Sequence, residues 1–424
     1  MPGLRATSGT IPSPSGTPQL LDFVKKAPQS RRVLVFGSAM HVWNDLFVAL
    51  MVPLLPLIKE DLELSFTEVG LLKSVFTGAT AILQIPTGLL AETTGEFWLL
   101  VLGNVWVGLG LVGMALSSSF AVLLALSFLG GLGGGAQHPL ASSMVSRAYD
   151  HGGRSTAVGT VNFAGDIGKM IAPLMAIAVA IPFGWRAALW VTGVVSLAFM
   201  LVTVMARRNI DIGRPAQEVS TAATPGGGSV QMGGFIILSG VGFLDSATRG
   251  AALAFLPFVM AAKDMTTAQV TVMLFFLFTG GALGKFVVGW LGDRFDAVSL
   301  IWATKGMTAL LLILALTAPP LGMVPLMIIL GVGLNGTSSA LYATVADFVP
   351  PHRRARLYGV FYTTNEAGTM LAPILYGLVA DFYSLSTAMV VMGLATGAIL
   401  PASLALRTHL SHAKSADTHS DAAL

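Results

Sequence analysis

The sequence predicts an all-α membrane protein of twelve transmembrane helices, arranged as two pseudo-symmetric bundles of six. Three observations predict this fold: the composition, the spacing of long apolar segments, and an internal repeat. Of the 424 residues, 54% are hydrophobic and only 11% are charged, whereas a soluble protein carries about 25% charged residues. So few charges cannot cover the surface of a water-soluble protein of this size, so most of the chain must face lipid.

Twelve segments are apolar and long enough to cross a bilayer, which takes about 20 helical residues. They are expected at residues 33–58, 68–91, 97–116, 120–146, 156–181, 186–206, 234–262, 266–291, 298–317, 322–349, 356–381 and 384–406. The first six form a bundle over residues 33–206, and the others form a second bundle over 234–406. Residues 207–233 are polar and glycine-rich, which predicts a flexible linker. Residues 1–32 and 407–424 are predicted to be disordered tails.

The cations lie almost entirely on one side of this topology. That side carries sixteen: Arg5, Lys25, Lys26, Arg31, Arg32, Arg147, Arg154, Arg207, Arg208, Arg214, Arg294, Arg353, Arg354, Arg356, Arg407 and Lys414. The opposite side carries Lys59, Arg186 and Lys263. Positively charged short loops stay in the cytoplasm. Both tails and the linker are therefore expected to be cytoplasmic, in a cell membrane of the bacterial inner-membrane type.

The two halves repeat at an offset of about 200 residues. Arg154, Gly159, Asp166, Gly168, Met170, Ala172 and Pro173 align with Arg354, Gly359, Glu366, Gly368, Met370, Ala372 and Pro373. At the same offset Asp45 aligns with Asp245. At an offset of 201, Gly88 and Glu92 align with Gly289 and Asp293. Parallel repeats of this kind are one known plan of secondary transporters, in which the substrate site lies at midplane between the repeats.

Several motifs resemble the major facilitator superfamily over nearly the whole chain. GWLGDRFD, after the eighth predicted helix, is similar to the loop motif of that superfamily, and GLLAETTGEF is a copy without the usual basic residues. HVWND, QIPTG, GGLGGGAQHPLASS and VNFAGDIGKMIAP resemble the fosmidomycin-resistance-type efflux branch. The superfamily resemblance implies alternating access, and the branch implies proton-driven export of a small compound.

Nine ionisable residues fall inside predicted spans: Asp45, Lys73, Asp166, Lys169, Asp245, Arg249, Lys285, Lys305 and Glu366. Each such charge costs about 2.5–3.5 kcal/mol or more near the bilayer centre, so it usually lines a cavity or pairs. Asp166 and Lys169 are three residues apart, and Asp245 and Arg249 are four apart, so each pair shares a helix face. Such pairs are either structural or switchable carboxylates. We interpret Lys305, early in its helix, as reaching the membrane interface.

The candidates for proton coupling are Asp45, His41, Asp166, Asp245 and Glu366. His41 and Asp45 are four residues apart, and histidine titrates near neutral pH, which suits a proton relay. The alternative is a polar packing cluster with Asn44 and Trp43. Both interpretations remain open.

The candidates for substrate binding are Asn44, Gln137, His138, Asn162, Lys169, Arg249, Lys285 and Asn365. Several cations around one cavity would favour an anionic substrate, because Arg and Lys bind carboxylate and phosphate oxygens well. Alternatively, each cation only neutralises an acid.

The candidates for gating are Glu92, Arg154, Gly289, Asp293, Arg294 and Arg354. They lie in the two loop motifs and the basic loops, which are expected to lock helices together across the halves in one state. Neutralising Asp293 should slow transport without changing substrate preference, and a shifted preference would contradict this role.

The sequence thus predicts a monomeric, proton-coupled exporter of a small compound, anionic in one version, with protons and membrane lipid as further partners. One alternative is an importer of a nutrient, an organic or inorganic anion, or a metal chelate. Another is a non-transporting sensor or assembly factor, against which the buried charges argue. The chain has no cysteine, and no nucleophile–base set, nucleotide motif or nucleic-acid-binding domain is visible. We therefore expect no enzyme activity, no cofactor and no metal site.

Overall fold

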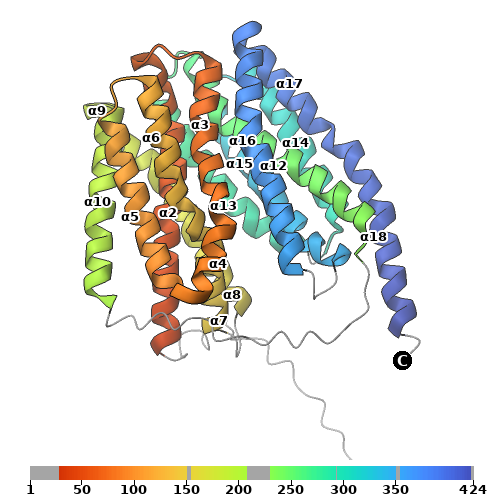
Figure 1. The fold of residues 1–424 in the computed structure, drawn as a ribbon. Helices are drawn as coiled ribbons and strands as arrows, with labels where there is room; N and C mark the ends of the chain where they lie inside the picture. The colour runs from red at the N-terminus through yellow and green to blue at the C-terminus, as the bar shows by residue number, and fades with distance from the viewer. Residues whose placement is uncertain (1–27, 150–153, 208–229, 293, 350–353, 422–424) are drawn as a thin grey trace, which may run out of the picture.

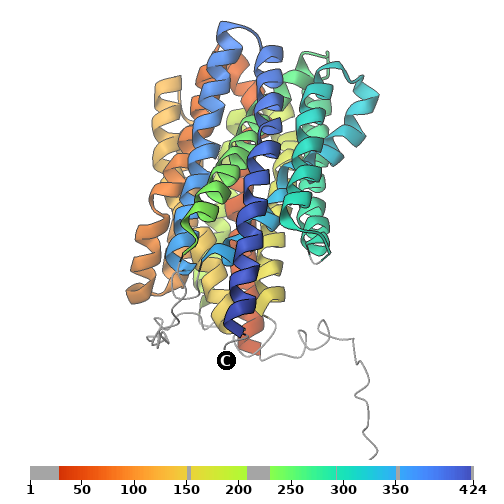
Figure 2. The ribbon, with the colours of Figure 1, turned by 90° about the vertical axis from the view of Figure 1, so that its right-hand side faces the viewer.

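The computed structural model describes residues 28–149, 154–207, 230–292, 294–349 and 354–421, and these residues form helices and no strand. The helices run roughly parallel in two bundles that stand side by side (Figure 1). The start of α2 and the end of α18 lie at the same end of the bundles (Figures 1 and 2). We call this end the terminal side and the opposite end the far side.

The helices of the first half are α2 (Pro28–Asp61), α3 (Phe66–Ile82), α4 (Gln84–Thr94), α5 (Glu96–Ala115), α6 (Phe120–Leu132), η1 (Gly133–Ala136), α7 (Gln137–Ala148), α8 (Arg154–Met175), η2 (Ala176–Ala180), α9 (Ile181–Phe183) and α10 (Trp185–Met205). Three of the six crossings consist of consecutive pieces: α3 with α4, α6 with η1 and α7, and α8 with η2 and α9. The break before α7 coincides with four residues, Gly-Gly-Gly-Ala, that form a tighter 3₁₀ turn. Glycine is a weak helix former, which favours an irregular turn there.

The helices of the second half are α12 (Met232–Ala261), α13 (Thr267–Leu291), α14 (Ala297–Thr317), η3 (Pro320–Gly322), α15 (Met323–Phe348), α16 (Arg354–Phe382), α17 (Leu385–Gly397) and α18 (Ile399–Asp421). Among the described residues, eleven helical stretches are long and apolar enough to cross a membrane. The predicted span that is not among them is the eleventh, α16, which is 29 residues long and includes the polar run TTNEAGT. The predicted all-α membrane fold is confirmed.

The predicted tails differ from the observed ends of the helical bundle. α2 begins at Pro28, and residues 1–27 lie outside the described residues. At the other end, α18 continues to Asp421, beyond residue 407 at which the predicted tail begins. Neither glycine nor proline occurs after Pro401, so no residue there terminates the helix. The predicted linker lies mostly outside the described residues, which omit 208–229.

The two halves begin their second crossing in the same way. Ser65 and Glu68 form a capping box at the start of α3, and Thr266 and Gln269 form one at the start of α13. A residue with positive φ precedes each box: Glu63 and Asp264. The matching caps and turns, at an offset of 201, support the internal repeat in three dimensions.

Close contacts between α2 and α8 recur between α12 and α16. A Cβ atom on Gly168 would lie 2.2 Å from the carbonyl oxygen of Val42, and one on Gly368 would lie 2.4 Å from that of Phe243. Only glycine allows helices to approach this closely. The contacts align α8 with α16 at an offset of 200, as predicted, but α2 with α12 at an offset of 201.

This register corrects the predicted match between Asp45 and Asp245. At an offset of 201, Asp45 corresponds to Ser246, and Asp245 corresponds to Asn44. One residue is about 100° around a helix, so the two aspartates point in different directions. The first crossings of the two halves therefore carry their acids on different faces.

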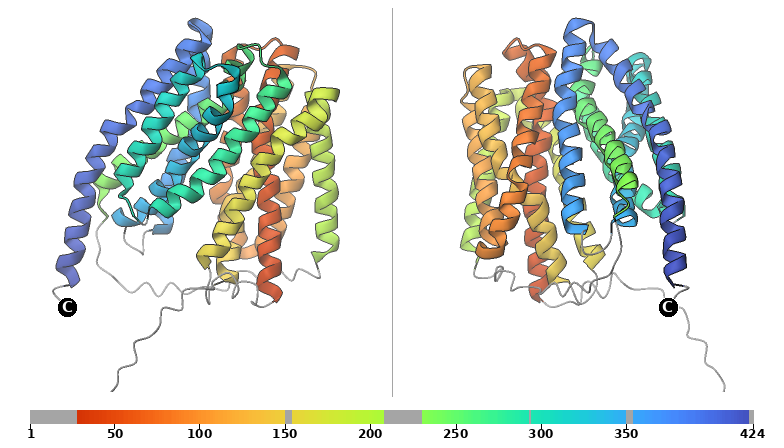
Figure 3. Two further views of the ribbon diagram at one scale, coloured as in Figure 1. Left: turned by 180° about the vertical axis from the view of Figure 1, so that it is seen from behind. Right: turned by 45° about the vertical axis from the view of Figure 1, so that its right-hand side comes forward.

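The halves contact each other mainly through α3 with α16 and α8 with α13, and Figure 3 shows α3 beside α16. A Cβ atom on Gly377 of α16 would lie 2.6 Å from the carbonyl oxygen of Phe66. The Phe66 ring packs edge-on against Phe258 of α12, with centroids 5.4 Å apart. Since Phe66 begins α3, next to the loop that follows α2, these contacts join the halves at the far side.

Candidate functional site

A chain of alternating charges lies between α2 and α8 in the middle of the first half. The ammonium of Lys169 is 2.9 Å from Asp45 of α2 and 3.0 Å from Asp166 of its own helix. Both carboxylates are buried. The predicted pair of Asp166 and Lys169 is formed, and Lys169 also forms an ion pair with Asp45 from another helix.

The second half contributes one cation to this chain. The Lys285 ammonium of α13 lies 2.7 Å and 2.9 Å from the two carboxylate oxygens of Asp166. Because α8 and α13 belong to different halves, this ion pair bridges the interface that must rearrange if the halves move. No partner for Lys285 could be predicted from its own helix, since its acid lies 119 residues away.

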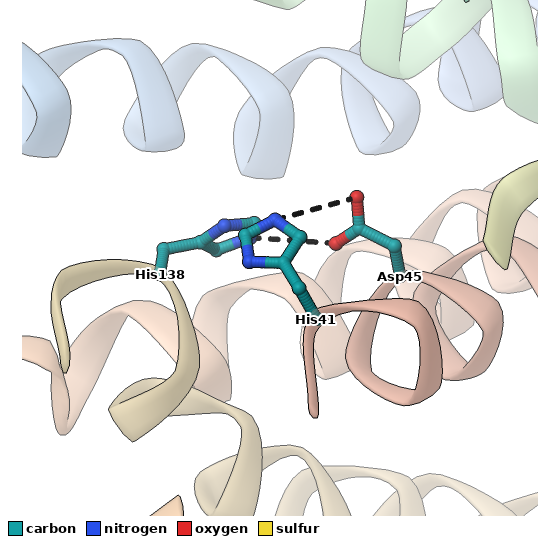
Figure 4. Close-up of side chains that lie close together, drawn as sticks. All are labelled: His41, Asp45 and His138. Carbon is teal, nitrogen blue, oxygen red and sulfur yellow. Dashed lines mark ion pairs between the residues drawn. The ribbon is translucent and has the colours of Figure 1, made fainter. Parts of the chain in front are cut away.

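Two imidazoles approach Asp45 on the other side of the chain of charges (Figure 4). The Nε2 atom of His41 lies 3.9 Å from one carboxylate oxygen, and the Nε2 atom of His138 lies 3.7 Å from the other. The two rings meet edge to face with centroids 4.7 Å apart. Asn44 donates to Asp45 at 3.1 Å and lies 3.4 Å from the His138 ring nitrogen. α2 and α7 thus bring together side chains nearly 100 residues apart.

Gly165 makes this arrangement possible. A Cβ atom at that position would lie 2.3 Å from Cδ2 of His41 and 2.5 Å from an oxygen of Asp45. The absence of a side chain on α8 therefore lets the two polar residues of α2 sit beside α8. In the second half the corresponding residue of α16 is Asn365, and it faces Gly242 of α12, which corresponds to His41.

The acids and cations of the second half are arranged differently. Asp245 lies 2.5 Å from the ammonium of Lys305 on α14 and 3.7 Å from Arg249 on its own helix. Lys305 is fully buried, so the prediction that it reaches the membrane interface is wrong. Its carboxylate partner lies on another helix, α12, and offsets the cost of burying the ammonium. Spacing along one helix could not predict this pair.

Lys73 and Glu366 face each other across the second contact between the halves. The buried Lys73 of α3 donates to Thr77 at 3.2 Å and interacts electrostatically with Glu366 of α16 and Arg249 of α12. Among the described residues, no cation lies within 4.0 Å of the Glu366 carboxylate. This carboxylate is only partly buried.

The remaining substrate-binding candidates lie in different environments. Gln137 is fully buried, and its amide donates to the carbonyl of Leu100 at 2.9 Å, which favours a packing role. Asn162 is exposed. Asn365 is buried, and its side-chain oxygen has no hydrogen-bond partner among the described residues. Asn365 therefore combines burial with an unmet polar atom, as does Gln137, whose side-chain oxygen also has no hydrogen-bond partner among the described residues.

Four gating candidates fall outside what the structure describes: Asp293, and the side chains of Glu92, Arg154 and Arg354. Gly289 is exposed with open space around it, and the Arg294 guanidinium lies 4.1 Å from the ring centroid of Trp290. A pair that the sequence analysis missed joins Glu96 of α5 to Arg147 of α7. Glu96 directly follows the GLLAETTG motif in the sequence, and this position was the signal that could have indicated the pair.

The side chains that face the interface between the halves keep some access to solvent. His138 is 46% exposed, and Lys285, Lys169 and Arg249 are 30%, 28% and 21% exposed. Three of these four groups are cations with donor hydrogens. A small molecule that enters between the halves would therefore meet positive charge, which favours carboxylate or phosphate groups.

Comparison with known proteins agrees with this architecture. The chain matches the Major Facilitator Superfamily over residues 37–230 and 238–422. It is 24% identical over 366 residues to the fosmidomycin resistance protein of Escherichia coli, covering 85% of this chain and 89% of that protein. It is 32% identical over 130 residues to a gentisate transporter of Corynebacterium glutamicum, covering 28% and 29%.

The structure also resembles a solved bacterial homologue of the human lysosomal transporter Spinster, in an inward-facing and occupied conformation. The TM-score is 0.74 at 17% identity, and the match covers 92% of this chain and 97% of the other. At this identity the similarity concerns the fold.

Proposed function

The chain belongs to the major facilitator superfamily, and from this premise we propose that it carries a small anionic compound together with a proton by alternating access. Its relatives are transporters, so the protein is a multi-pass membrane transporter and not an enzyme. The substrate class, the coupling ion and the direction are the proposal, and the following observations support it.

The first support is the position of the contacts between the halves. The halves pack tightly at the far side, where Gly377 adjoins Phe66 and where Gly70 adjoins Pro373. The interfacial cations nevertheless remain partly exposed. We infer a state that is open toward the terminal side, which the distribution of cations predicts to be cytoplasmic.

The observation that carries the proposal is the ion pair between Lys285 and Asp166. It is the pair among the described residues in which a cation of one half holds an acid of the other within 3.0 Å. An anionic substrate that bound Lys285 would compete with Asp166 for its ammonium. Asp166 would then lose a cation that favours its ionised form, and it would take up a proton more readily.

Binding of the proton to Asp166 and binding of the anion to Lys285 favour each other, and this positive coupling predicts cotransport. Protonation of Asp166 releases Lys285 for the anion, and the anion in turn favours protonation, so each ligand strengthens the binding of the other. The proton and the anion therefore cross together. With the usual inward proton gradient, that cycle drives uptake.

Export is the second candidate, and the similarity to the fosmidomycin resistance protein favours it. An exporter that exchanges its substrate for protons needs the two ligands to exclude each other. In this site, that would require a substrate group that competes with the proton for Asp166 itself, such as a cation or a hydrogen-bond donor. The two candidates thus differ in the sign of the linkage.

The test uses the purified chain in proteoliposomes, with radiolabelled fosmidomycin and gentisate as probes. Cotransport predicts that an acidic exterior accelerates uptake of at least one probe by about tenfold over equal pH, which corresponds to about 1.4 kcal/mol. Asp166→Asn should keep exchange of the probe across the membrane but lose its response to the pH gradient. Glu60→Gln, an exposed residue of α2 outside the site, should behave like wild type.

Two results would change the conclusion. Faster efflux against the proton gradient would favour export by proton exchange. A response to pH that survives in Asp166→Asn would remove Asp166 from the coupling step.

A further inference from the structure

We propose that His41, Asp45 and His138 form a binding site for a divalent transition-metal ion of the Zn²⁺ type. Each residue offers one ligand atom, and these atoms all lie within 4.8 Å of one another. Figure 4 shows both imidazoles turned toward the carboxylate. Two imidazole nitrogens and one carboxylate oxygen are the donors that zinc and similar borderline metals prefer.

The distances suit a site that closes around an ion. Zinc binds imidazole nitrogen and carboxylate oxygen at about 2.0–2.2 Å, which places tetrahedral ligands about 3.3 Å apart. The nitrogen-to-oxygen distances are 3.9 Å for His41 and 3.7 Å for His138. These two distances run to different oxygens of Asp45, and the three ligand atoms lie within 4.8 Å of one another. To reach the ligand separation of a tetrahedral site, the donors would have to approach one another by up to about 1.5 Å.

The hydrogen bonds of His41 do not explain why the ring is buried. Only 2% of this residue is exposed, and Nδ1 is buried without a hydrogen-bond partner among the described residues. Nε2 lies too far from Asp45 for a hydrogen bond. Buried polar groups are normally satisfied, so the unmet Nδ1 atom leaves the burial of this ring unexplained by hydrogen bonds.

Lys169 competes with the metal for Asp45 but has a second partner. Its ammonium lies 2.9 Å from Asp45 and 3.0 Å from Asp166. It can therefore release Asp45 to a metal ion and remain paired with Asp166. The metal would replace one ammonium contact on Asp45, so removal of the Lys169 charge should strengthen metal binding.

The fourth position of the site is open to an exogenous ligand. His138 is nearly half exposed, so the metal would face the region between the halves. The four charges of Asp45, Asp166, Lys169 and Lys285 sum to zero, and a divalent ion adds two positive charges. A small carboxylate or phosphonate in the fourth position would offset them.

The second half has no equivalent site. In the register set by the helix contacts, the positions equivalent to His41, Asp45 and His138 are occupied by Gly242, Ser246 and Ser338. None of these three offers a strong zinc ligand. We therefore expect one high-affinity site per chain.

The test measures zinc binding to the full purified chain, with any affinity tag removed, by equilibrium dialysis against ⁶⁵Zn²⁺ in a chelator-buffered series. Wild type should bind one Zn²⁺ per chain. His41→Ala and His138→Ala should each weaken binding by at least about a hundredfold, whereas His409→Ala, on α18, should leave it unchanged. Lys169→Met should tighten binding by at least about tenfold.

The Lys169→Met variant keeps the inference falsifiable if a histidine variant fails to fold, because it retains all three ligands. Co²⁺ added in place of Zn²⁺ should give the intense visible absorption of a four-coordinate site, lost in His138→Ala. Zinc binding that persists in both histidine variants, or is unchanged in Lys169→Met, would overturn the proposal. The readout is binding, so it is independent of whether the chain transports a proton with its substrate.

Discussion

The carboxylate of Asp381 accepts hydrogen bonds from Thr67 in the first turn of α3, although the two residues lie in different halves of the molecule. One oxygen is 2.8 Å from the backbone nitrogen of Thr67 and 2.5 Å from its hydroxyl, and the other is 2.8 Å from the nitrogen of Phe66. The last turn of α16 thus satisfies amides at the start of α3 that have no partner within their own helix. This cap joins the two halves at the far side.

Removal of the cap should shift the protein toward the state that opens at the far side. Asp381→Ala loses charge-assisted bonds that, at this exposed position, contribute about 1 kcal/mol after solvent screening, or about a fivefold change in population. The chain has no native cysteine, so spin labels on Glu60→Cys and Tyr383→Cys can report the distance across the far side. Asp264→Asn, an exposed far-side acid, is the control. An unchanged distance distribution in Asp381→Ala would show that the cap does not bias the two states.

A single methyl group at Gly165 should disable the site with little effect on the rest of the fold. In Gly165→Ala the Cβ atom would overlap His41 and Asp45, so both side chains must move away from Lys169. We expect transport of the responsive probe to fall by at least about tenfold. Gly159→Ala, on the same helix with open space around it, should transport at the wild-type rate. Equal activity of the two variants would contradict the tight packing described around Gly165.

Asp245 and Lys305 should depend on each other for stability. Removing one partner of a buried ion pair costs about 3–5 kcal/mol, because the other charge is left without compensation, whereas replacing both is often nearly neutral. Asp245→Asn and Lys305→Met should each lower the Tm in detergent, and the double variant should recover most of the loss. A double variant no more stable than the weaker single variant would mean that the two charges act separately.

The orientation in the membrane can be tested with two single cysteines. Leu321, on the far side between α14 and α15, and Phe295, on the terminal side after α13, are both exposed. In intact cells a membrane-impermeant maleimide should label Leu321→Cys and spare Phe295→Cys. Both should react after the membrane is permeabilised. The reverse pattern would place the termini outside and invalidate the charge-based orientation.

Much of the charged site was visible in the sequence as a set of residues, but not as a set of partners. The spacing of Asp166 and Lys169 predicted a pair that the structure contains. The same argument assigned Asp245 to Arg249, yet the shorter contact is with Lys305 from another helix. Spacing along one helix reports only neighbours on that helix. Partners from other helices depend on how the bundle packs.

The repeat shows the same limit at the level of a single residue. The aligned aspartates at 45 and 245 suggested equivalent acids, and the matching glycines at 168 and 368 were correctly aligned. Packing against those glycines sets α2 and α12 one residue apart in register. A single-residue difference rotates a side chain by about 100°, which is why Asp45 faces α8 while Asp245 reaches α14.

The sequence by itself determined that the chain crosses a membrane about twelve times in two related halves, because lipid forces long apolar helices and makes buried charges rare enough to count. Only the tertiary structure decided which charges meet. It placed Lys285 on Asp166 across the two halves, and it grouped His41, Asp45 and His138 beside a glycine that leaves them room. Ion pairs and metal ligands act over a few ångströms, and the distances between helices are set by packing, which no single helix encodes.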